Sequence, residues 1–398
     1  MNNRVIIAGA GPAGMVAAAC LAQNDIPVTV CEALDDLPTD LRASTFHPPT
    51  LDQLDRFEGL TRELIDWGLI APKWQYRDRT EGVVATYDMS VLADLTNHPY
   101  RLQAEQWKLT RLLEKRLAAL PNAELLYGHE ALGAHQDADH AYLTVRTPDG
   151  EKVLKGAYVV GADGATSAVR RSSDIDFEGI TFPEFYVTLS TDHDFAKDLP
   201  KLTYVNYVAD PSEWLVLLRT VENWRVLLPT DGTQTQDQIL DDANVQRRLN
   251  AVAPQDRPFN VIHKTIYRVH ERVAAKYVLG RVLLAGDAAH INNPLGGMGM
   301  NGGIQDAFNL AEKLIEVRDG GDPGLLLGRY ERQRKKIAKD FVQQNAIRNR
   351  EQLRETDPEL RRQRHAEMRR TAEDPVLCRE FLTRSSMIAA LREAAEIE

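Results

Sequence analysis

The first fourteen residues constrain the fold most strongly, because a short apolar stretch runs straight into a glycine-rich turn. Residues 4–8 read RVIIA, a run that is typical of a parallel strand buried on both faces. The turn that follows, Gly9-Ala10-Gly11-Pro12-Ala13-Gly14, opens an alanine-rich helical pattern over residues 13–23. A second apolar strand is predicted over residues 28–31. The pattern therefore predicts a complete βαβ unit, the start of an α/β fold.

Each glycine of this turn has a mechanical reason. Gly9 allows the tight turn, Gly11 lets the backbone approach a pyrophosphate, and Gly14 permits close packing of helix on strand. Ala13 lies in the first turn of the helix, whose N-terminus would face the phosphates. Glu32 follows Gly14 by eighteen residues at the end of the second strand, where a carboxylate can bind a ribose hydroxyl. The motif predicts a bound dinucleotide without distinguishing NAD from FAD.

Length and charge narrow the class of protein. A chain of 398 residues exceeds the size at which one core keeps growing, so we expect two domains or one domain with an insertion. The formal net charge of −10 argues against a nucleic-acid partner, and no apolar run is long enough to span a membrane. The cysteines form no CxxC pair and the histidines no metal-ligand spacing. We expect a cytoplasmic protein, a monomer or homodimer, without a metal.

Two further motifs lie far from the N-terminus. Residues 161–170 read GADGATSAVR and contain Asp163, and residues 280–290 read GRVLLAGDAAH and contain Gly286 and Asp287. Together with the N-terminal turn, and in this order, they resemble the class A flavoprotein monooxygenases of the para-hydroxybenzoate hydroxylase family. The resemblance implies FAD as the cofactor, with the carboxylate of Asp287 bonded to its ribityl chain.

The segment after the third motif resembles the family's flavin-facing loop. Five glycines in residues 296–303 allow backbone N–H groups to converge on the polar edge of a ligand. A helix is predicted to start near Asn301, and its dipole would stabilise negative charge on a reduced flavin. Met298 stands where the family often has glutamine. The resemblance implies contacts near the flavin from Pro294, Gly297, Gly299, Met300 and Asn301.

Three single-residue matches are weaker. Arg42 resembles the family's arginine that contacts the FAD phosphates, and Gln103 resembles its glutamine near the flavin. Arg42 is the stronger of the two matches, and an ordinary surface or helix-start residue is the alternative for each, because a single match carries little information. Arg268 resembles an arginine used for the nicotinamide cofactor, with a plain surface arginine as the alternative.

The resemblance also implies the chemistry. NADH or NADPH visits transiently and reduces the flavin, O2 then adds to give a C4a-hydroperoxide, and its distal oxygen attacks a small aromatic substrate. A phenol or a hydroxylated N-heteroaromatic is expected, and its ring becomes nucleophilic when a proton is removed. His47 is our candidate for the base, with a structural histidine as the alternative, and Tyr207 could relay the proton.

Other polar and aromatic residues are assigned predicted roles from their place along the chain. Tyr204, Arg219 and Trp224 belong to a β-rich region over residues 186–229, which should cover the flavin ring, so we expect them to bind the substrate. Ordinary core or surface roles are the alternative for each. His290 follows the third motif and is expected to pin its loop by hydrogen bonding.

The predicted architecture is α/β, with a Rossmann-like FAD-binding domain and an inserted β-sheet domain for the substrate. A C-terminal helical region with solvated faces follows. Two other functions stay open: a reductase or halogenase on the same scaffold, although the halogenase signature Trp-x-Trp-x-Ile-Pro is absent, and a flavin-binding protein that responds to redox state through its charged tail. The expected segments are 1–73, 101–178 and 268–329 for FAD, 74–100 and 179–267 for the substrate, and 330–398 for the helices.

Overall fold

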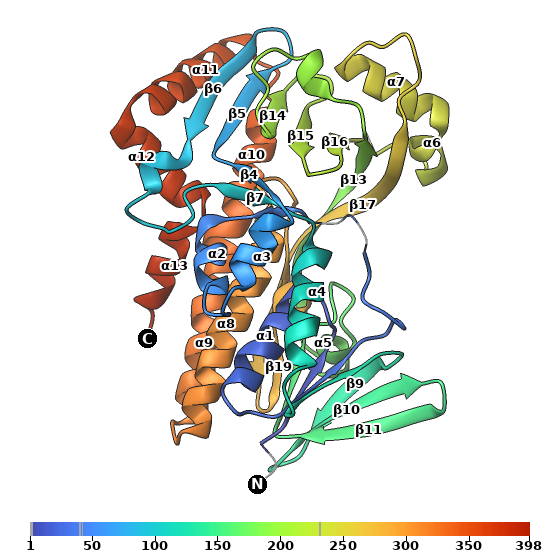
Figure 1. Cartoon of the computed structure of the whole chain (residues 1–398), viewed down its shortest axis with the longest axis vertical. Coiled ribbons are helices and arrows are strands. Elements are labelled where there is room, and N and C mark those ends of the chain that lie inside the picture. The colour runs from blue at the N-terminus through green and yellow to red at the C-terminus, as the bar shows by residue number, and fades with distance from the viewer. Residues whose placement is uncertain (1–2, 40, 42, 231) are drawn as a thin grey trace.

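Two large sheets lie one above the other, and helices cover them from both sides (Figure 1). The structure is a computed structural model that describes residues 3–398 except 40, 42 and 231, and the side chains of residues 341–346 lie outside this description. Among the described residues, every helix is too short or too polar to cross a lipid bilayer.

The lower sheet in Figure 1 has six strands in the order β18-β19-β12-β1-β2-β8. Strand β1 pairs in parallel with both β2 and β12, and all its residues are buried, as the apolar run predicted. Helix α1 (Pro12–Gln23) packs between α4 (Gln106–Leu117) and α8 (Gly299–Arg318). The strands are β1 (Val5–Ala8), β2 (Val28–Cys31), β8 (Ala123–Leu126), β12 (Tyr158–Gly161), β18 (Val278–Leu279) and β19 (Val282–Leu284).

Two smaller sheets complete this half of the molecule. An antiparallel sheet of β9 (Glu130–Gln136), β10 (Ala141–Thr147) and β11 (Gly150–Gly156) connects β8 to β12, and the sequence analysis did not predict it. A second sheet places β7 between two partners, and this arrangement brings residues 45 and 103 opposite each other. Its strands are β3 (Thr45–Phe46), β4 (Leu69–Ala71) and β7 (Arg101–Gln103), and the nearby helices are α2 (Pro48–Leu54) and α3 (Leu60–Asp66).

The upper sheet has eight strands in the order β20-β17-β13-β16-β15-β14-β5-β6. A separate buried cluster covers each face: one contains α6 (Gln236–Leu240) and α7 (Asp242–Val252), the other the C-terminal helices. Strand β17 continues past residue 268, where the cofactor domain was expected to resume. The strands are β5 (Lys73–Asp78), β6 (Gly82–Asp88), β13 (Phe177–Thr191), β14 (Val205–Ala209), β15 (Leu215–Arg219), β16 (Trp224–Pro229), β17 (Val261–Ala274) and β20 (His290–Ile291).

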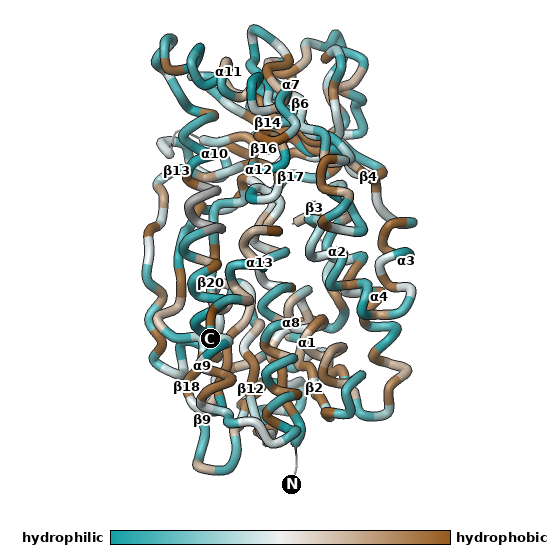
Figure 2. The backbone as a smooth tube through the Cα atoms, turned by 90° about the vertical axis from the view of Figure 1, so that its left-hand side faces the viewer, coloured by the Kyte–Doolittle hydropathy of each residue, from teal (hydrophilic) through white to brown (hydrophobic). Residues whose placement is uncertain are grey.

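The C-terminal helices fold back onto the upper sheet. Three of them start at an Asp-Pro pair, in which the aspartate caps the first backbone N–H groups and the proline takes the first helical position. Most of α11 has the colour of hydrophilic residues in Figure 2, yet Met368, Cys378 and Leu382 are buried in one cluster with Trp74. Most residues of α11 are exposed, which agrees with the predicted solvated helix faces, while one side of the C-terminal helices packs into this cluster. The helices are α9 (Pro323–Ile337), a π-helical turn (Ala338–Gln343), α10 (Gln344–Leu353), α11 (Pro358–Glu373), α12 (Pro375–Ser385) and α13 (Ile388–Ala395).

Candidate active site

The three glycines of the N-terminal turn have different surroundings. A Cβ on Gly9 would lie 2.4 Å from the carbonyl oxygen of Ala162, and one on Gly14 would lie 2.0 Å from the oxygen of Gly9. A Cβ on Gly11 would meet nothing within 4 Å. Two glycines therefore let the backbones pack, while the third leaves open space in front of the N-terminus of α1, where Ala13 lies.

Two predicted acidic residues are engaged with backbone N–H groups. Glu32 accepts hydrogen bonds from Ala10 N at 3.0 Å and from Leu34 N at 3.1 Å, so its carboxylate lies beside the glycine turn. Asp163 accepts from Ser167 Oγ at 2.5 Å and from the N–H groups of residues 168 and 169. Asp163 thus caps α5 (Ala168–Ser172) and shapes its own turn. Arg42 lies outside the described residues.

The turn around Asp287 touches the first turns of two helices. Gly286 has φ +62°, and a Cβ there would lie 3.0 Å from the Cβ of Ala13 in α1. A Cβ on Gly303 in α8 would lie 3.0 Å from the Cα of Gly286. Asp287 itself is exposed in this turn. The arrangement lines up the N-termini of α1 and α8 with an acidic turn between them, which suits one long dinucleotide better than two separate ligands.

A buried ionic cluster holds this turn in place. Asp306 of α8 accepts from Gly286 N at 3.0 Å, and the same oxygen lies 2.7 Å from Nε2 of His290. The guanidinium of Arg334 in α9 donates to the other oxygen of Asp306 and, at 3.1 Å, to the carbonyl of Gly302. Burial alone would raise the pKa of Asp306, but its cationic neighbours hold that pKa below the ordinary value. The contact of His290 fits the pinning role expected for it, whereas the sequence analysis missed both Asp306 and Arg334.

The flavin-facing loop is tied to β3 by side chains. Asn301 accepts from His47 N at 2.9 Å and donates to the carbonyls of Thr45 and Gly297, both at 2.8 Å. Nε2 of His47 donates to the carbonyl of Gly296 at 2.8 Å. These bonds fix the backbone where Gly296 and Gly297 adopt φ of +103° and +67°.

His47 does not fit the general-base role expected for it. Its side chain is fully buried, and burial, aided by the charge of Arg101, lowers the pKa of His47 to about 3. A base works best when its pKa lies near the working pH, so this neutral imidazole is a weak proton acceptor. Its hydrogen bond to Gly296 instead supports the structural alternative.

The rest of the loop packs closely. Pro294 accepts from Gly297 N at 3.0 Å, which closes a tight turn, and it is only partly buried. A Cβ on Gly299 would lie 2.9 Å from Oδ1 of Asn292, so the start of α8 leaves no room there. Met300 packs against the main core.

Gln103 provides a free donor beside this loop. Its Oε1 accepts from Thr45 Oγ1 at 3.0 Å, while its buried Nε2 has no partner among the described residues. An unpaired buried donor is costly, and a polar flavin edge would satisfy it. Together with the open space at Gly11 and the exposed Asp287, this donor fits a cofactor that extends from α1 to α8.

A cavity of about 320 Å³ lies between this loop and the upper sheet. Trp74 stacks on Tyr87 with ring centroids 4.4 Å apart, and Tyr207 meets Trp74 edge-on at 5.5 Å. Arg101 donates to the hydroxyl of Tyr207 at 3.2 Å. The loop contributes Gly296 and Met298, and α10, α11 and α12 contribute Arg348, Asn349, Gln352, Leu353, Arg364, Glu367, Met368, Thr371, Phe381 and Ser385. Tyr207 thus lines the cavity, and its catalytic role stays a prediction.

The three residues expected to bind the substrate do not line this cavity. Trp224 is buried in the cluster on the opposite face of the upper sheet, where its Nε1 donates to Asp194 at 3.2 Å. Arg219 lies over the Trp224 ring at 5.9 Å, and Tyr204 is an exposed residue just before β14. Side chains alternate between the faces of a strand, so the expectation placed Arg219 and Trp224 on the wrong face and does not carry forward.

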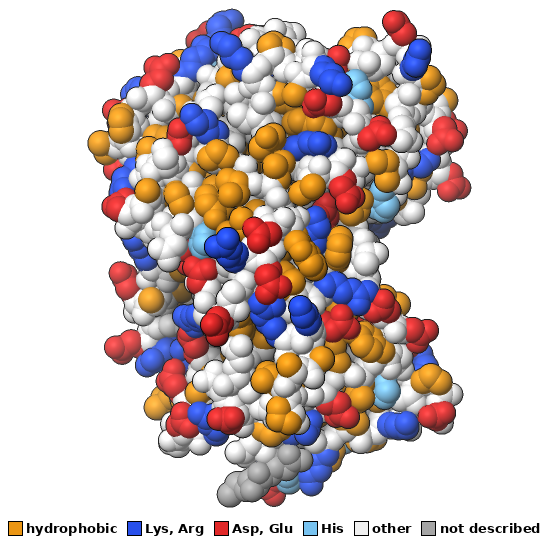
Figure 3. Space-filling view, in the orientation of Figure 1, with side chains coloured by type: hydrophobic (Ala, Val, Ile, Leu, Met, Phe, Trp, Pro, Cys, Tyr) orange, Lys and Arg blue, Asp and Glu red, His pale blue; other side chains and the backbone are white. Residues whose placement is uncertain are grey.

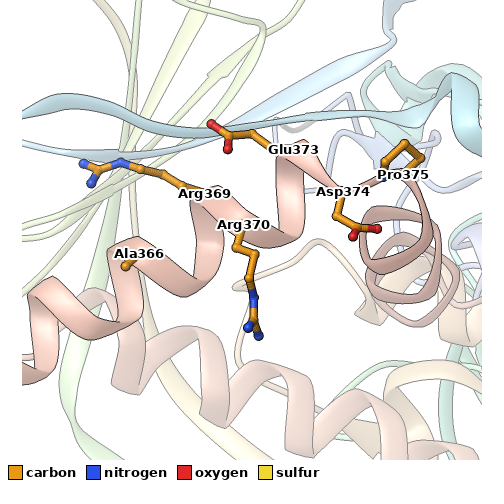
Figure 4. A pocket seen from close by; sticks show the side chains of 6 residues that line it. All are labelled: Ala366, Arg369, Arg370, Glu373, Asp374 and Pro375. Carbon is orange, nitrogen blue, oxygen red and sulfur yellow. The ribbon is translucent and has the colours of Figure 1, made fainter.

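A second hollow lies on the outer surface at the junction of α11 and α12 (Figure 4). All its lining residues are exposed, and Figure 4 shows Arg369 and Arg370 pointing in different directions. No polar groups converge there, so we assign it no ligand. On the face shown in Figure 3, acidic and basic side chains are mixed, and the outline is indented at the right between the two halves.

The comparison with known families decides the class. A model described as "FAD binding domain" matches residues 2–345. The chain belongs to this FAD-binding family. A para-nitrophenol 4-monooxygenase of Pseudomonas sp. strain WBC-3 is 35% identical over 95% of this chain and 94% of its own length. A 6-hydroxy-3-succinoylpyridine 3-monooxygenase of Pseudomonas putida is 32% identical over 88% of each protein.

Solved structures agree with this family. The crystal structure of a p-nitrophenol 4-monooxygenase from Pseudomonas putida matches this FAD-binding protein with a TM-score of 0.90 and 32% identity, over 95% of this chain and 96% of that one. An anhydrotetracycline hydroxylase from Streptomyces rimosus matches with a TM-score of 0.79 and 30% identity, over 97% of this chain and 76% of that one. The protein is a flavoprotein aromatic monooxygenase of α/β fold, with FAD as its cofactor.

Proposed function

We propose that this flavoprotein hydroxylates a small phenol or hydroxylated N-heteroaromatic, with NADH or NADPH as the electron donor and O2 as the oxidant. The observation that carries the substrate class is the cavity, in which aromatic rings surround the buried guanidinium of Arg101 beside the flavin-facing loop. The relatives named above act on para-nitrophenol and on a hydroxylated pyridine, and both carry an oxygen on a six-membered aromatic ring.

The size of the cavity favours a single ring. Sites for small molecules measure roughly 300–1,000 Å³, and this cavity of about 320 Å³ is at the lower end of that range. The flat faces of Trp74 and Tyr87 offer stacking partners for one aromatic ring. A polycyclic substrate would have to displace the C-terminal helices that close the cavity.

The geometry of the glycine turn and of the flavin-facing loop supports an assignment of residues that would hold FAD. We assign the pyrophosphate to Gly11 and Ala13 at the N-terminus of α1, in a turn that Gly9 and Gly14 keep closely packed, and a ribose to Glu32. We assign the ribityl chain to Gly286 and Asp287, and the flavin ring to Gln103 and the backbone at Gly297, with Gly299, Met300 and Asn301 supporting the shape of that loop. When bound, FAD supplies the electrons that activate O2 for transfer to the substrate ring.

The residues of the chain hold the flavin-facing loop in position and keep water out of the cavity. His47 and Asn301 hold the flavin-facing loop rigid through the hydrogen bonds described above, and Pro294 closes its turn. Water is excluded from the cavity by the rings of Tyr207 and Trp74 and by the C-terminal helices that close it. This protects a reactive oxygen species from loss to solvent.

The test is substrate-stimulated oxidation of NADH or NADPH. The purified holoenzyme is assayed with para-nitrophenol, other phenols and hydroxypyridines, and the products are analysed by mass spectrometry under 18O2. We expect faster cofactor oxidation and one 18O atom in the product. Oxidation that yields only hydrogen peroxide with every compound would contradict the proposal.

A further inference from the structure

Arg101 is a buried cation that has no anionic partner among the described residues. Its side chain lines the cavity, yet the residue is only 2% exposed. Its printed contacts are the hydroxyl of Tyr207 at 3.2 Å and the faces of the Trp74 and Tyr207 rings at 5.0 and 6.0 Å. Its Nε has no hydrogen-bond partner, and within the described part of the chain no carboxylate pairs with it.

The other arginines of the cavity differ from Arg101. Arg364 forms a 2.9 Å ion pair with Glu355, so its charge is already balanced. Arg348 is exposed to solvent, where water screens its charge. Glu367, the only acidic residue among the described cavity residues, is itself exposed on α11. Arg101 alone combines deep burial with an uncompensated charge at the wall of the cavity.

A buried charge of this kind destabilises the protein unless a bound anion pairs with it. An isolated buried ion costs several kcal/mol, and the cost is recovered only when an anion with good geometry pairs with it. Nε1 of Trp74 is a second buried donor without a partner beside the same cavity. The site therefore offers donors and a positive charge together, which is the chemistry that recognises a compact oxyanion.

We propose that Arg101 binds the ring oxygen of the substrate as an oxyanion, so that the substrate is held as its phenolate in the resting complex. The inference rests on the proposed function, since it names the charge state of that substrate. The O–H bond of the phenol breaks, its electron pair stays on oxygen, and the proton is released to the solvent. Activation of the ring then needs no side chain as general base, in agreement with the geometry of His47.

The groups around Arg101 leave this charge unopposed. His47 lies before α2 and is neutral, because burial and the neighbouring guanidinium lower its pKa. Tyr207 of β14 and Tyr87 of β6 line the cavity, and burial raises the pKa of Tyr87. From the C-terminal helices come Arg348, Arg364 and Glu367, whose charges are exposed or paired.

The experiment measures the ionisation of bound 4-nitrophenol, whose phenolate absorbs visible light and whose phenol does not. Oxidised holoenzyme is titrated at a pH one unit below the pKa of the free ligand, and the release of protons is measured in weak buffer. We expect the difference spectrum of the phenolate and a net release of nearly one proton per ligand bound. A spectrum of the neutral phenol without proton release would overturn the proposal.

Variants separate charge from shape. Arg101→Met should weaken binding of 4-nitrophenol at least tenfold and abolish proton release, whereas Arg101→Lys should keep the bound ligand ionised. Arg364→Gln, which changes an arginine of the same cavity that has its own partner, should leave the ionisation unchanged. Binding of 4-nitroanisole, which carries a methyl ether in place of the ionisable hydroxyl, should not weaken in Arg101→Met. Equal losses for both ligands, with Arg101→Lys no better than Arg101→Met, would refute the assignment.

The readout does not depend on turnover. If the phenolate binds but no hydroxylated product forms, the proposed function fails and the assignment of Arg101 stands. If product forms from a ligand that binds neutral, the function stands and the assignment fails.

Discussion

Nε of Arg334 lies 2.6 Å from Oδ1 of Asp306, and both side chains are at most 1% exposed. The pair joins α9 to α8, and the second carboxylate oxygen of Asp306 accepts from the backbone of Gly286. One buried carboxylate thus connects the position of two helices to the turn that carries Asp287.

Replacing Asp306 with Ala should destabilise the protein strongly. The change leaves the guanidinium of Arg334 buried without a partner, and breaking a buried pair in this way costs about 3–5 kcal/mol. Denaturant unfolding of the apoprotein measures the loss. Asp319→Asn, which removes an exposed ion pair with Arg318, is the matched control and should leave the free energy of unfolding unchanged. Similar values for the two variants would contradict the importance of the buried pair.

Acid should destabilise the fold through His47. The pKa of His47 is lowered to about 3 in the folded chain, from an ordinary value of 6.5. As the pH falls below this ordinary value, His47 becomes protonated in the unfolded chain but stays neutral in the folded chain. The free energy of unfolding should therefore fall from this group with a slope approaching about 1.4 kcal/mol per pH unit, down to the folded pKa.

The substitution His47→Gln tests this origin. The variant should lose that part of the pH slope, while the exposed His135→Gln keeps it. Above pH 7, His47→Gln should also keep the pH profile of turnover, because glutamine can still donate to the carbonyl of Gly296. A slope unchanged in His47→Gln would assign the acid sensitivity to other groups.

The glycine turn allows a matched pair of substitutions. Gly14→Ala places a methyl group 2.0 Å from the carbonyl oxygen of Gly9, so the turn must shift, and the apoprotein should lose about 1–3 kcal/mol of stability. Gly11→Ala meets no protein atom, and its φ of −70° suits alanine. It should leave the apoprotein stable but weaken FAD binding at least about tenfold, or about 1.4 kcal/mol. Unfolding curves and flavin fluorescence titrations distinguish the two effects.

Asp287→Ala should weaken the binding of FAD. The residue is exposed in a turn that is held by the hydrogen bond from Gly286 N to Asp306, so its carboxylate is accessible to a cofactor. Loss of a hydrogen bond to a charged group costs about 1.5–3 kcal/mol, so FAD affinity should fall roughly 10- to 150-fold. Unchanged retention of FAD would remove Asp287 from the site.

The nucleotide half of the fold could be predicted from the sequence because its signals are local. The apolar strand, the glycine turn and the helix are contiguous, and the predicted strand over residues 28–31 coincides with β2. The motifs around Asp163 and Asp287 identified the family, and the family match confirms it. The sequence analysis still missed the ion pair of Asp306 and Arg334, because no local pattern connects α8 with α9.

The substrate half depends on contacts that no local pattern specifies. Alternation predicted strands around Trp224 but not which face of the sheet meets the cavity. The charged surface of α11 hid the apolar side of the C-terminal helices, although the repeated Asp-Pro helix starts indicated an ordered bundle. Arg101 stands two residues before Gln103 on the same strand face, so alternation from Gln103 was the available signal for it.

The cavity joins rings that lie near opposite ends of the chain, Trp74 on β5 and Phe381 on α12, with centroids 5.8 Å apart. A ribosome must therefore finish α12 before any substrate pocket exists, whereas the first βα unit is complete early in translation. The residues that select the substrate and the residues that bind the nucleotide therefore lie on different segments. Exchanges on the cavity side of α10, α11 and α12 can change which aromatic compound is accepted, while the glycine turns that serve the nucleotide remain as they are.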